Sequence, residues 1–285
     1  MKRRTFLHQS MAATAALSCL PSRLLSAPAG SDPLHEIGLI TNVVQKMIAE
    51  NPEATLSMIA DLGYRKLEFG GDFGLGKEKL KSLLGELGIR PVAGGTNLAG
   101  MQGDGLKQLM DDCLYMGKEY VVCYWPWMDG GENPTLEKVR YAVDQLQDMG
   151  EQCRKAGLRL AFHNHWHEFV VDEGQVLYDY ILEQTDPDTV CMEVDLYWAY
   201  KGKADIRDYF KKHPGRFELV HLKDSYDKEG METFAPVGDG VIDFPDLLSY
   251  REVAGFRHPI VEHDRPEDEA YCACRSMEYL KSIDY

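Results

Sequence analysis

Beyond residue 30, the pattern of apolar and polar positions alternates between two periods. Short apolar runs with the character of strands are each followed by a longer stretch in which apolar residues recur at helical spacing. The runs are EIGLI, RKLEF, RPVAGG, EYVVCYW, LRLAFHNH, TVCMEVD, FELVHLKD and HPIVEHD. The amphipathic stretches cover residues 53–62, 77–87, 104–116, 134–156, 174–184, 204–212, 243–253 and 266–282. Eight strand-and-helix units in about 255 residues are typical of a (β/α)8 barrel.

The residues between the runs support this count of helices. Asn51 stands before Pro52, which is the order of a cap residue and an early proline at a helix start, and Gly63, Gly88 and Gly157 follow expected helix ends. A doubly wound open sheet is the competing architecture. It is disfavoured because no G-x-G-x-x-G follows the first run and no change of composition divides the chain. The sequence therefore predicts an α/β protein, a single-domain (β/α)8 TIM barrel over residues 30–285.

The first 29 residues have the composition of an export signal peptide. Arg3 and Arg4 precede Phe-Leu, the apolar run 11–20 is too short to cross a bilayer, and Ala27-Pro28-Ala29 forms a small-residue cleavage site. The arginine pair resembles a twin-arginine signal, which serves folded proteins. We expect a mature chain that starts at Gly30 and an exported, periplasmic location. Lipidation at Cys19 is the weaker alternative.

The charge of the chain narrows the class of partner. The formal net charge is −15. The first 29 residues contain basic but no acidic side chains, so the net charge of the rest of the chain is more negative still. This balance argues against binding to nucleic acid or to an anionic membrane surface, both of which require basic patches. No membrane-spanning segment is expected in the mature chain. The cysteines form no C-x-x-C pair, and Cys123 and Cys191 lie in apolar runs as ordinary core thiols.

Titratable residues end each of the last four apolar runs. In a (β/α)8 barrel, the carboxyl ends of the strands meet on one face, and residues two apart point to the same side of a strand. Imidazoles and carboxylates together suit Mn²⁺, Co²⁺, Fe²⁺ or Zn²⁺, and without a cation the carboxylates would repel one another. Each residue alone would be unremarkable, but four successive strand ends favour a metal centre. The pairs are His163 with His165, Glu193 with Asp195, His221 with Lys223, and Glu262 with Asp264.

The same region carries a family resemblance. The segments AFHNHWHEF, EVDLYW, VHLKDS, VGDGVIDF and IVEHD resemble the sugar phosphate isomerase/epimerase family of xylose-isomerase-like barrels, and the resemblance extends over residues 35–285. It implies a carbohydrate enzyme that acts through a metal-bound enediolate. It also implies one divalent ion (Mn, Co, Fe, Zn or Mg) with the ligands His163, Asp195, His221 and Glu262. His163 departs from the Glu of most members, and Trp198 stands where many have His.

The departure at His163 bears on the type of reaction. Isomerisation and epimerisation in this family are thought to use two carboxylates as acid and base, and His163 removes one of them. A keto-sugar lyase or dehydratase needs one base and one acid, and either can be a histidine. An exported sugar-binding barrel without catalysis is the alternative function. The candidate catalytic residues are His165, Glu168, Glu262 and Lys223, although Lys223 could instead pair with Asp224 or Glu193.

The substrate is expected to be a small sugar or keto-sugar. Glu68 ends the second strand and could meet substrate hydroxyls, or it could pair with Lys66 or Lys223. Trp125 and Trp127 could form an apolar wall for a sugar ring, with ordinary loop packing as the alternative. Trp198 completes this substrate-binding set. No strong phosphate cradle is present, and the sequence leaves the oligomeric state open.

The segment PVGDGVID, residues 236–243, has the glycines of a tight loop, and Asp243 is expected to cap the following helix.

Overall fold

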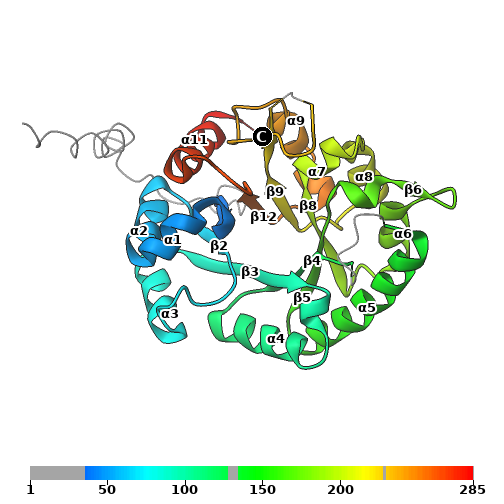
Figure 1. Ribbon diagram of the computed structural model, residues 1–285, viewed down its shortest axis with the longest axis horizontal. Coiled ribbons are helices and arrows are strands. Elements are labelled where there is room, and N and C mark those ends of the chain that lie inside the picture. Colours follow the sequence, from blue (N-terminus) through cyan, green and yellow to red (C-terminus); the bar gives the residue numbers. More distant parts are fainter. Residues whose placement is uncertain (1–35, 128–133, 227–228, 285) are drawn as a thin grey trace, which may run out of the picture. The chain divides into compact units, whose positions relative to one another are not determined.

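Eight parallel strands close into a barrel in the computed structural model, which describes residues 36–127, 134–226 and 229–284. Their order around the barrel is β1-β12-β9-β8-β5-β4-β3-β2 (Figure 1). The predicted (β/α)8 barrel is confirmed, while the predicted export signal lies outside the described residues. The strands are β1 (Gly38–Ile40), β2 (Lys66–Glu68), β3 (Arg90–Asn97), β4 (Tyr120–Trp125), β5 (Arg159–His163), β8 (Val190–Asp195), β9 (Leu219–Leu222) and β12 (His258–Val261).

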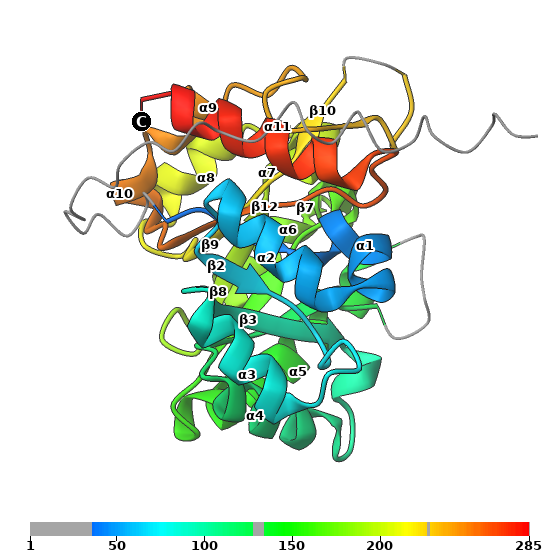
Figure 2. The same ribbon diagram turned by 90° about the vertical axis from the view of Figure 1, so that its left-hand side faces the viewer.

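Helices surround the barrel on its outside (Figures 1 and 2). Asn51 starts one of them as expected, since its side chain accepts a hydrogen bond from the Ala54 amide at 3.1 Å, and Gly63 ends it at a left-handed φ of 108°. The helices that match the predicted stretches are α2 (Pro52–Leu62), α3 (Lys77–Glu86), α4 (Gly105–Met116), α5 (Leu136–Lys155), α6 (Leu177–Gln184), α8 (Ile206–Lys212), α9 (Phe244–Leu248) and α11 (Glu269–Ser282).

Several short elements were not predicted, because each is shorter than the window in which periodicity can be recognised. The predicted helix 243–253 is two helices, α9 and α10, and the predicted helix 174–184 begins only at Leu177 because a tight turn at Glu173 and Gly174 forms a hairpin first. The additional elements are α1 (Gln45–Glu50), α7 (Leu196–Lys201), α10 (Arg251–Ala254), the 3-10 turns η2 (Thr41–Val44), η3 (Ala99–Met101) and η4 (Trp166–Phe169), and the hairpins β6–β7 (Val171–Asp172, Gln175–Val176) and β10–β11 (Asp224–Ser225, Phe234–Ala235).

The alternation of side chains along the strands separates the core from the barrel interior. Phe162, Val194, Leu222 and Val261 have no exposed surface and belong to the apolar core. Because neighbours along a strand point to opposite faces, the titratable residues beside them face the interior. Among the described residues, no helix is long and apolar enough to cross a membrane. Cys123 and Cys191 are free and buried, as expected of core thiols.

The two ends of the barrel interior differ in their contacts. At the amino end of β9, Glu218 is buried, and its carboxylate accepts a hydrogen bond from the Tyr120 hydroxyl at 2.7 Å and pairs with Arg159 at 2.7 Å. This carboxylate is therefore matched by donors and cations. The carboxyl ends of the strands hold a denser set of acidic and imidazole groups.

The segment after β11 folds as a tight loop, as its glycines predict. The amides of Gly238, Gly240 and Ile242 all donate to the Asp224 carboxylate. Asp243 then caps α9 by accepting a hydrogen bond from the Asp246 amide at 3.1 Å, which confirms its predicted role.

Candidate functional site

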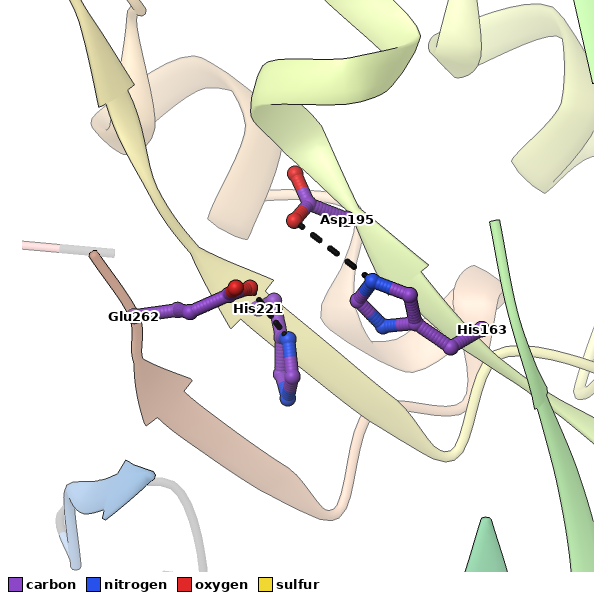
Figure 3. Close-up of side chains that lie close together, drawn as sticks. All are labelled: His163, Asp195, His221 and Glu262. Atoms are coloured by element: carbon purple, nitrogen blue, oxygen red, sulfur yellow. Dashed lines mark hydrogen bonds and ion pairs between the residues drawn. The ribbon is translucent and has the colours of Figure 1, made fainter. Parts of the chain in front are cut away.

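The four predicted metal ligands converge at the carboxyl ends of four adjacent strands (Figure 3). His163 ends β5, Asp195 ends β8, His221 lies in β9, and Glu262 directly follows β12. All four are buried, and one ligand atom from each lies within 4.8 Å of the corresponding atoms of the others. The structure thus brings together the whole set that the sequence predicted.

The contacts within this cluster leave one carboxylate oxygen without a hydrogen bond. His163 Nε2 lies 3.8 Å from Asp195 Oδ2, and that oxygen has no hydrogen-bond partner among the described residues. His221 Nδ1 lies 2.6 Å from Glu262 Oε2. Lys223 Nζ lies 3.6 Å from Asp195 Oδ2, an ion pair beyond hydrogen-bond distance. A buried carboxylate oxygen without a hydrogen-bond donor is costly unless a cation or a proton satisfies it.

The excess of buried acidic groups at the site also favours a bound cation. The buried carboxylates of Asp195 and Glu262 lie 3.6 Å and 3.2 Å from the Nζ of the buried Lys223, and the carboxylates of Glu68 and Glu193 are buried beside the two histidines. Burial raises the pKa of Glu193 to about 8 and raises the pKa of Asp195 well above its usual range. A divalent ion would offset this excess of negative charge. The mixed imidazole and carboxylate donors fit Mn²⁺, Co²⁺, Fe²⁺ or Zn²⁺ better than Mg²⁺, which prefers oxygen ligands.

Two further carboxylates lie behind the histidines. Glu193 Oε2 is 3.0 Å from His163 Nδ1, and Glu68 Oε2 is 3.0 Å from His221 Nε2. The Tyr124 hydroxyl also donates to Glu68 Oε1 at 2.5 Å. Glu68 is fully buried, and its described partners are His221 and Tyr124 rather than Lys223, while the contact with substrate hydroxyls and the alternative pair with Lys66 stay predictions.

A cavity of about 310 Å³ opens above the cluster. This volume is at the lower end of the range typical of small-molecule sites. No lysine or arginine is present among the described residues that line it. The titratable residues that line it are Tyr124, His163, His165, His221, Glu262 and Asp264.

A larger cavity of about 630 Å³ lies between β11 and the start of α11. Phe234, His263 and Arg265 are among its lining residues, and none of the four predicted ligands is. The chemistry of the site therefore belongs to the smaller cavity.

Two of the predicted catalytic residues adjoin each other but face different surroundings. His165 lines the cavity with its Nδ1 buried, and burial lowers its pKa to about 3, so the ring is neutral. Glu168 is fully buried, and its Oε2 accepts a hydrogen bond from the His165 amide at 2.6 Å. Burial raises the pKa of Glu168 to about 7. Glu168 thus holds the backbone of His165 and does not line the cavity.

Lys223 has different partners from those predicted. Its Nζ pairs with Asp264 Oδ2 at 2.6 Å and with Glu262 Oε1 at 3.2 Å, and it lies over the Trp198 ring at 4.6 Å from the centroid. Pairing with Asp224 is wrong because that carboxylate accepts backbone amides of the loop 238–242. Lys223 therefore neutralises part of the acidic cluster from behind the cavity wall.

The tryptophans support the site indirectly. The rings of Trp125 and Trp198 lie 5.0 Å and 5.3 Å from the ring of His165. Trp127 is buried and packs edge-on against Trp125 at 6.5 Å. Since none of the three lines the cavity, the expected stacking wall is a layer behind His165 rather than a surface for substrate.

Three residues that the sequence interpretation assigned neither as ligands nor as catalytic groups contact the centre; Glu193 and Asp264 were placed among the polar strand ends, and Tyr124 was not singled out. Tyr124 and Asp264 line the cavity, and Glu193 contacts His163. Asp264 and Glu193 each stand two residues from a predicted ligand, which was a usable signal. Tyr124 precedes the expected aromatic wall at the end of β4, and only its hydroxyl contact with Glu68 reveals its place.

Known proteins resemble this chain in sequence and in fold. An inosose dehydratase of Salmonella agona is 31% identical over 160 residues, which are 51% of this chain and 48% of that protein, so the match spans about half the length of this relative. An inosose dehydratase of Geobacillus kaustophilus is 26% identical over 231 residues, 69% of this chain and 74% of that protein.

Among solved structures, a sugar phosphate isomerase/epimerase from Parabacteroides distasonis has the same fold. Its TM-score is 0.77 at 22% identity, over 92% of this chain and 98% of that chain. The family model described as xylose isomerase-like TIM barrel matches residues 56–283, which include all four predicted ligands. The chain belongs to the xylose isomerase-like TIM barrel family.

Proposed function

We propose that this protein is a divalent-metal-dependent dehydratase of an uncharged keto-sugar or keto-cyclitol, such as an inosose. The observation that carries the proposal is the convergence of two imidazoles and two carboxylates beside a small cavity that His163, His221 and Glu262 line. The inosose dehydratases among its relatives support dehydration over the other reactions that this fold can host.

The side chains can divide the chemistry between them. His163, Asp195, His221 and Glu262 would hold the ion. When bound, a divalent ion would polarise the carbonyl of the substrate and acidify the adjacent C–H group.

Proton movement falls to the other groups that line the cavity. His165 lines the cavity with a neutral ring, so this imidazole can accept the proton from carbon. Burial and the nearby Glu262 raise the pKa of Asp264, so this carboxyl can carry the proton that the departing hydroxyl needs. One C–H and one C–O bond break, a C=C bond forms, and the hydroxyl leaves as water.

The lining of the cavity favours an uncharged substrate. The described lining residues include no lysine or arginine that would bind a phosphate group. A phosphorylated sugar would bring its anion into a cavity that offers no basic side chain to pair with it. We therefore expect the free keto compound to be used in preference to its phosphate ester.

The proposal is tested by turnover of a panel of ketones. Metal-depleted protein is reloaded separately with Mn²⁺, Co²⁺, Fe²⁺ or Zn²⁺ and incubated with an inosose, free keto-sugars and their phosphate esters. NMR and mass spectrometry should detect a product lighter than the substrate by one water, formed only with metal. The control is the metal-loaded Asp195→Asn variant, which should form no product.

Other outcomes would point to the competing functions. Exchange of solvent deuterium into the substrate with formation of an isomer, and no loss of water, would replace dehydration by isomerisation or epimerisation. Sugar binding that needs no metal and gives no product would support the exported sugar-binding barrel.

A further inference from the structure

We propose that Glu193 is a positioning residue that fixes the tautomer and orientation of His163 for metal binding. The inference rests on the proposed metal centre and assigns a role to a residue outside its ligand set. Glu193 is fully buried in β8, two residues before the predicted ligand Asp195, and the parallel register of β5 and β8 pairs it with His163.

The geometry defines what Glu193 does. Its Oε2 lies 3.0 Å from His163 Nδ1, while the other ring nitrogen, Nε2, lies 3.8 Å from Asp195 Oδ2. A neutral imidazole carries one N–H, and a carboxylate is an acceptor. A divalent ion in the cluster would keep Glu193 ionised. The Nδ1–H of a neutral His163 is then donated to Glu193, and Nε2 presents its lone pair to the metal cluster.

The remaining contacts of Glu193 fit the same role. Its Oε1 has no hydrogen-bond partner among the described residues and lies 3.4 Å from His221 Nε2. The nearer partner of that nitrogen is Glu68 Oε2, at 3.0 Å. Each ligand histidine thus has a buried carboxylate on the side facing away from its metal partner, and Glu193 lies between the two rings.

A second reading of these atoms is that Glu193 is itself a ligand. Glu68, Glu193 and His221 also offer three atoms within 4.8 Å of one another. That arrangement would bind a second ion and would give a stoichiometry of two. In that arrangement Glu193 would bind an ion itself rather than only orient His163, so counting the ions distinguishes the two roles.

The experiment measures metal affinity in the full chain. Wild-type, Glu193→Gln and Glu193→Ala proteins are depleted of metal and titrated with Co²⁺ or Zn²⁺ against a chromophoric chelator. Loss of an orienting partner typically weakens metal binding by about 10–100-fold. We expect the Glu193→Ala variant to lose metal affinity by a factor in this range. The Glu193→Gln variant should lose less affinity, because glutamine keeps an oxygen acceptor and nearly the same volume.

The matched control is Glu218→Gln, which makes the same change at a buried carboxylate three residues before His221, at the other end of the barrel interior. It should lower the unfolding midpoint but keep the metal dissociation constant within about threefold of wild type, because its partners are Tyr120 and Arg159.

A double-mutant cycle separates orientation from simple charge loss. In a His163→Glu background there is no imidazole for Glu193 to orient, so Glu193→Gln should change the affinity by less than about threefold. If Glu193→Gln lowers metal affinity equally in the wild-type and His163→Glu proteins, Glu193 acts only through its charge, and the proposal is overturned.

The remaining outcomes are also decisive. Two ions per wild-type chain, or unchanged affinity in both Glu193 variants, would overturn the positioning role. A wild-type protein that binds none of these metals would refute the proposed function itself.

Discussion

Replacing Asp195 by Asn should remove metal binding and leave the fold intact. Asp195 has two roles that use different oxygens. Its Oδ1 accepts a hydrogen bond from the Trp198 amide at 3.0 Å and caps α7, whereas Oδ2 faces His163 without a hydrogen-bond partner among the described residues. Asparagine keeps an oxygen for the cap and loses the negative charge and the second oxygen. Alanine would also remove the cap, at a cost of about 1 kcal/mol.

The magnitude follows from the linkage of metal binding to folding. At a metal concentration 100 times the dissociation constant, binding stabilises the native state by about 2.7 kcal/mol. For a domain of this size, 1 kcal/mol corresponds to roughly 2–4 °C in Tm, so metal should raise the wild-type Tm by about 5–11 °C. If Asn weakens binding 100-fold, the same concentration gives only about 0.4 kcal/mol, a shift under about 2 °C.

The assay is thermal unfolding of chelator-treated protein with and without added metal, followed by circular dichroism. The control is Asp205→Asn, the same change at the cap of α8, where the side chain accepts a hydrogen bond from the Arg207 amide. This variant should keep the full metal-dependent shift. A shift of wild-type size in Asp195→Asn, or no shift in wild type with any of the metals, would refute the assignment of Asp195 as a ligand.

Three further predictions concern reaction type, pH and export. Substituting Glu for His163 should keep metal binding but lower elimination activity, since added negative charge weakens polarisation of the carbonyl; preserved or raised turnover would favour isomerisation instead. Burial lowers the pKa of His258 to about 3 from its usual 6.5. As pH falls, His258 is therefore protonated in the unfolded chain before it is protonated in the folded protein. Protonation favours the unfolded state, so the free energy of unfolding decreases as pH falls below about 6.5. Denaturant unfolding should show that His258→Gln loses about 2 kcal/mol less than wild type between pH 7 and pH 5, and equal losses would contradict this. Amino-terminal sequencing of the native protein should begin at Gly30, and a soluble cytoplasmic product that retains residues 1–29 would argue against export.

The sequence by itself determined the barrel and the end of it at which the titratable residues gather. The eight strand-and-helix units were visible as changes of period, and alternation along each strand decided which residues face inward. The titratable pairs at the last four strand ends could be recognised because these places are local properties of the chain, and the family resemblance then selected His163, Asp195, His221 and Glu262 as the expected ligands. Parallel strands then meet at one face whatever the details of packing.

Only the tertiary structure decided which polar groups contact one another. Glu68 lies 153 residues before His221 in the sequence, yet their side chains are 3.0 Å apart. Lys223 pairs with Asp264 and Glu262 rather than with Asp224. Glu168 accepts a hydrogen bond from a backbone amide and does not face the cavity. Hydrogen bonds are made or lost within a few tenths of an ångström, and those distances depend on register and side-chain rotamers across strands that are remote in sequence. The pattern of residue types could therefore place each group at the right end of the barrel but could not assign its partner.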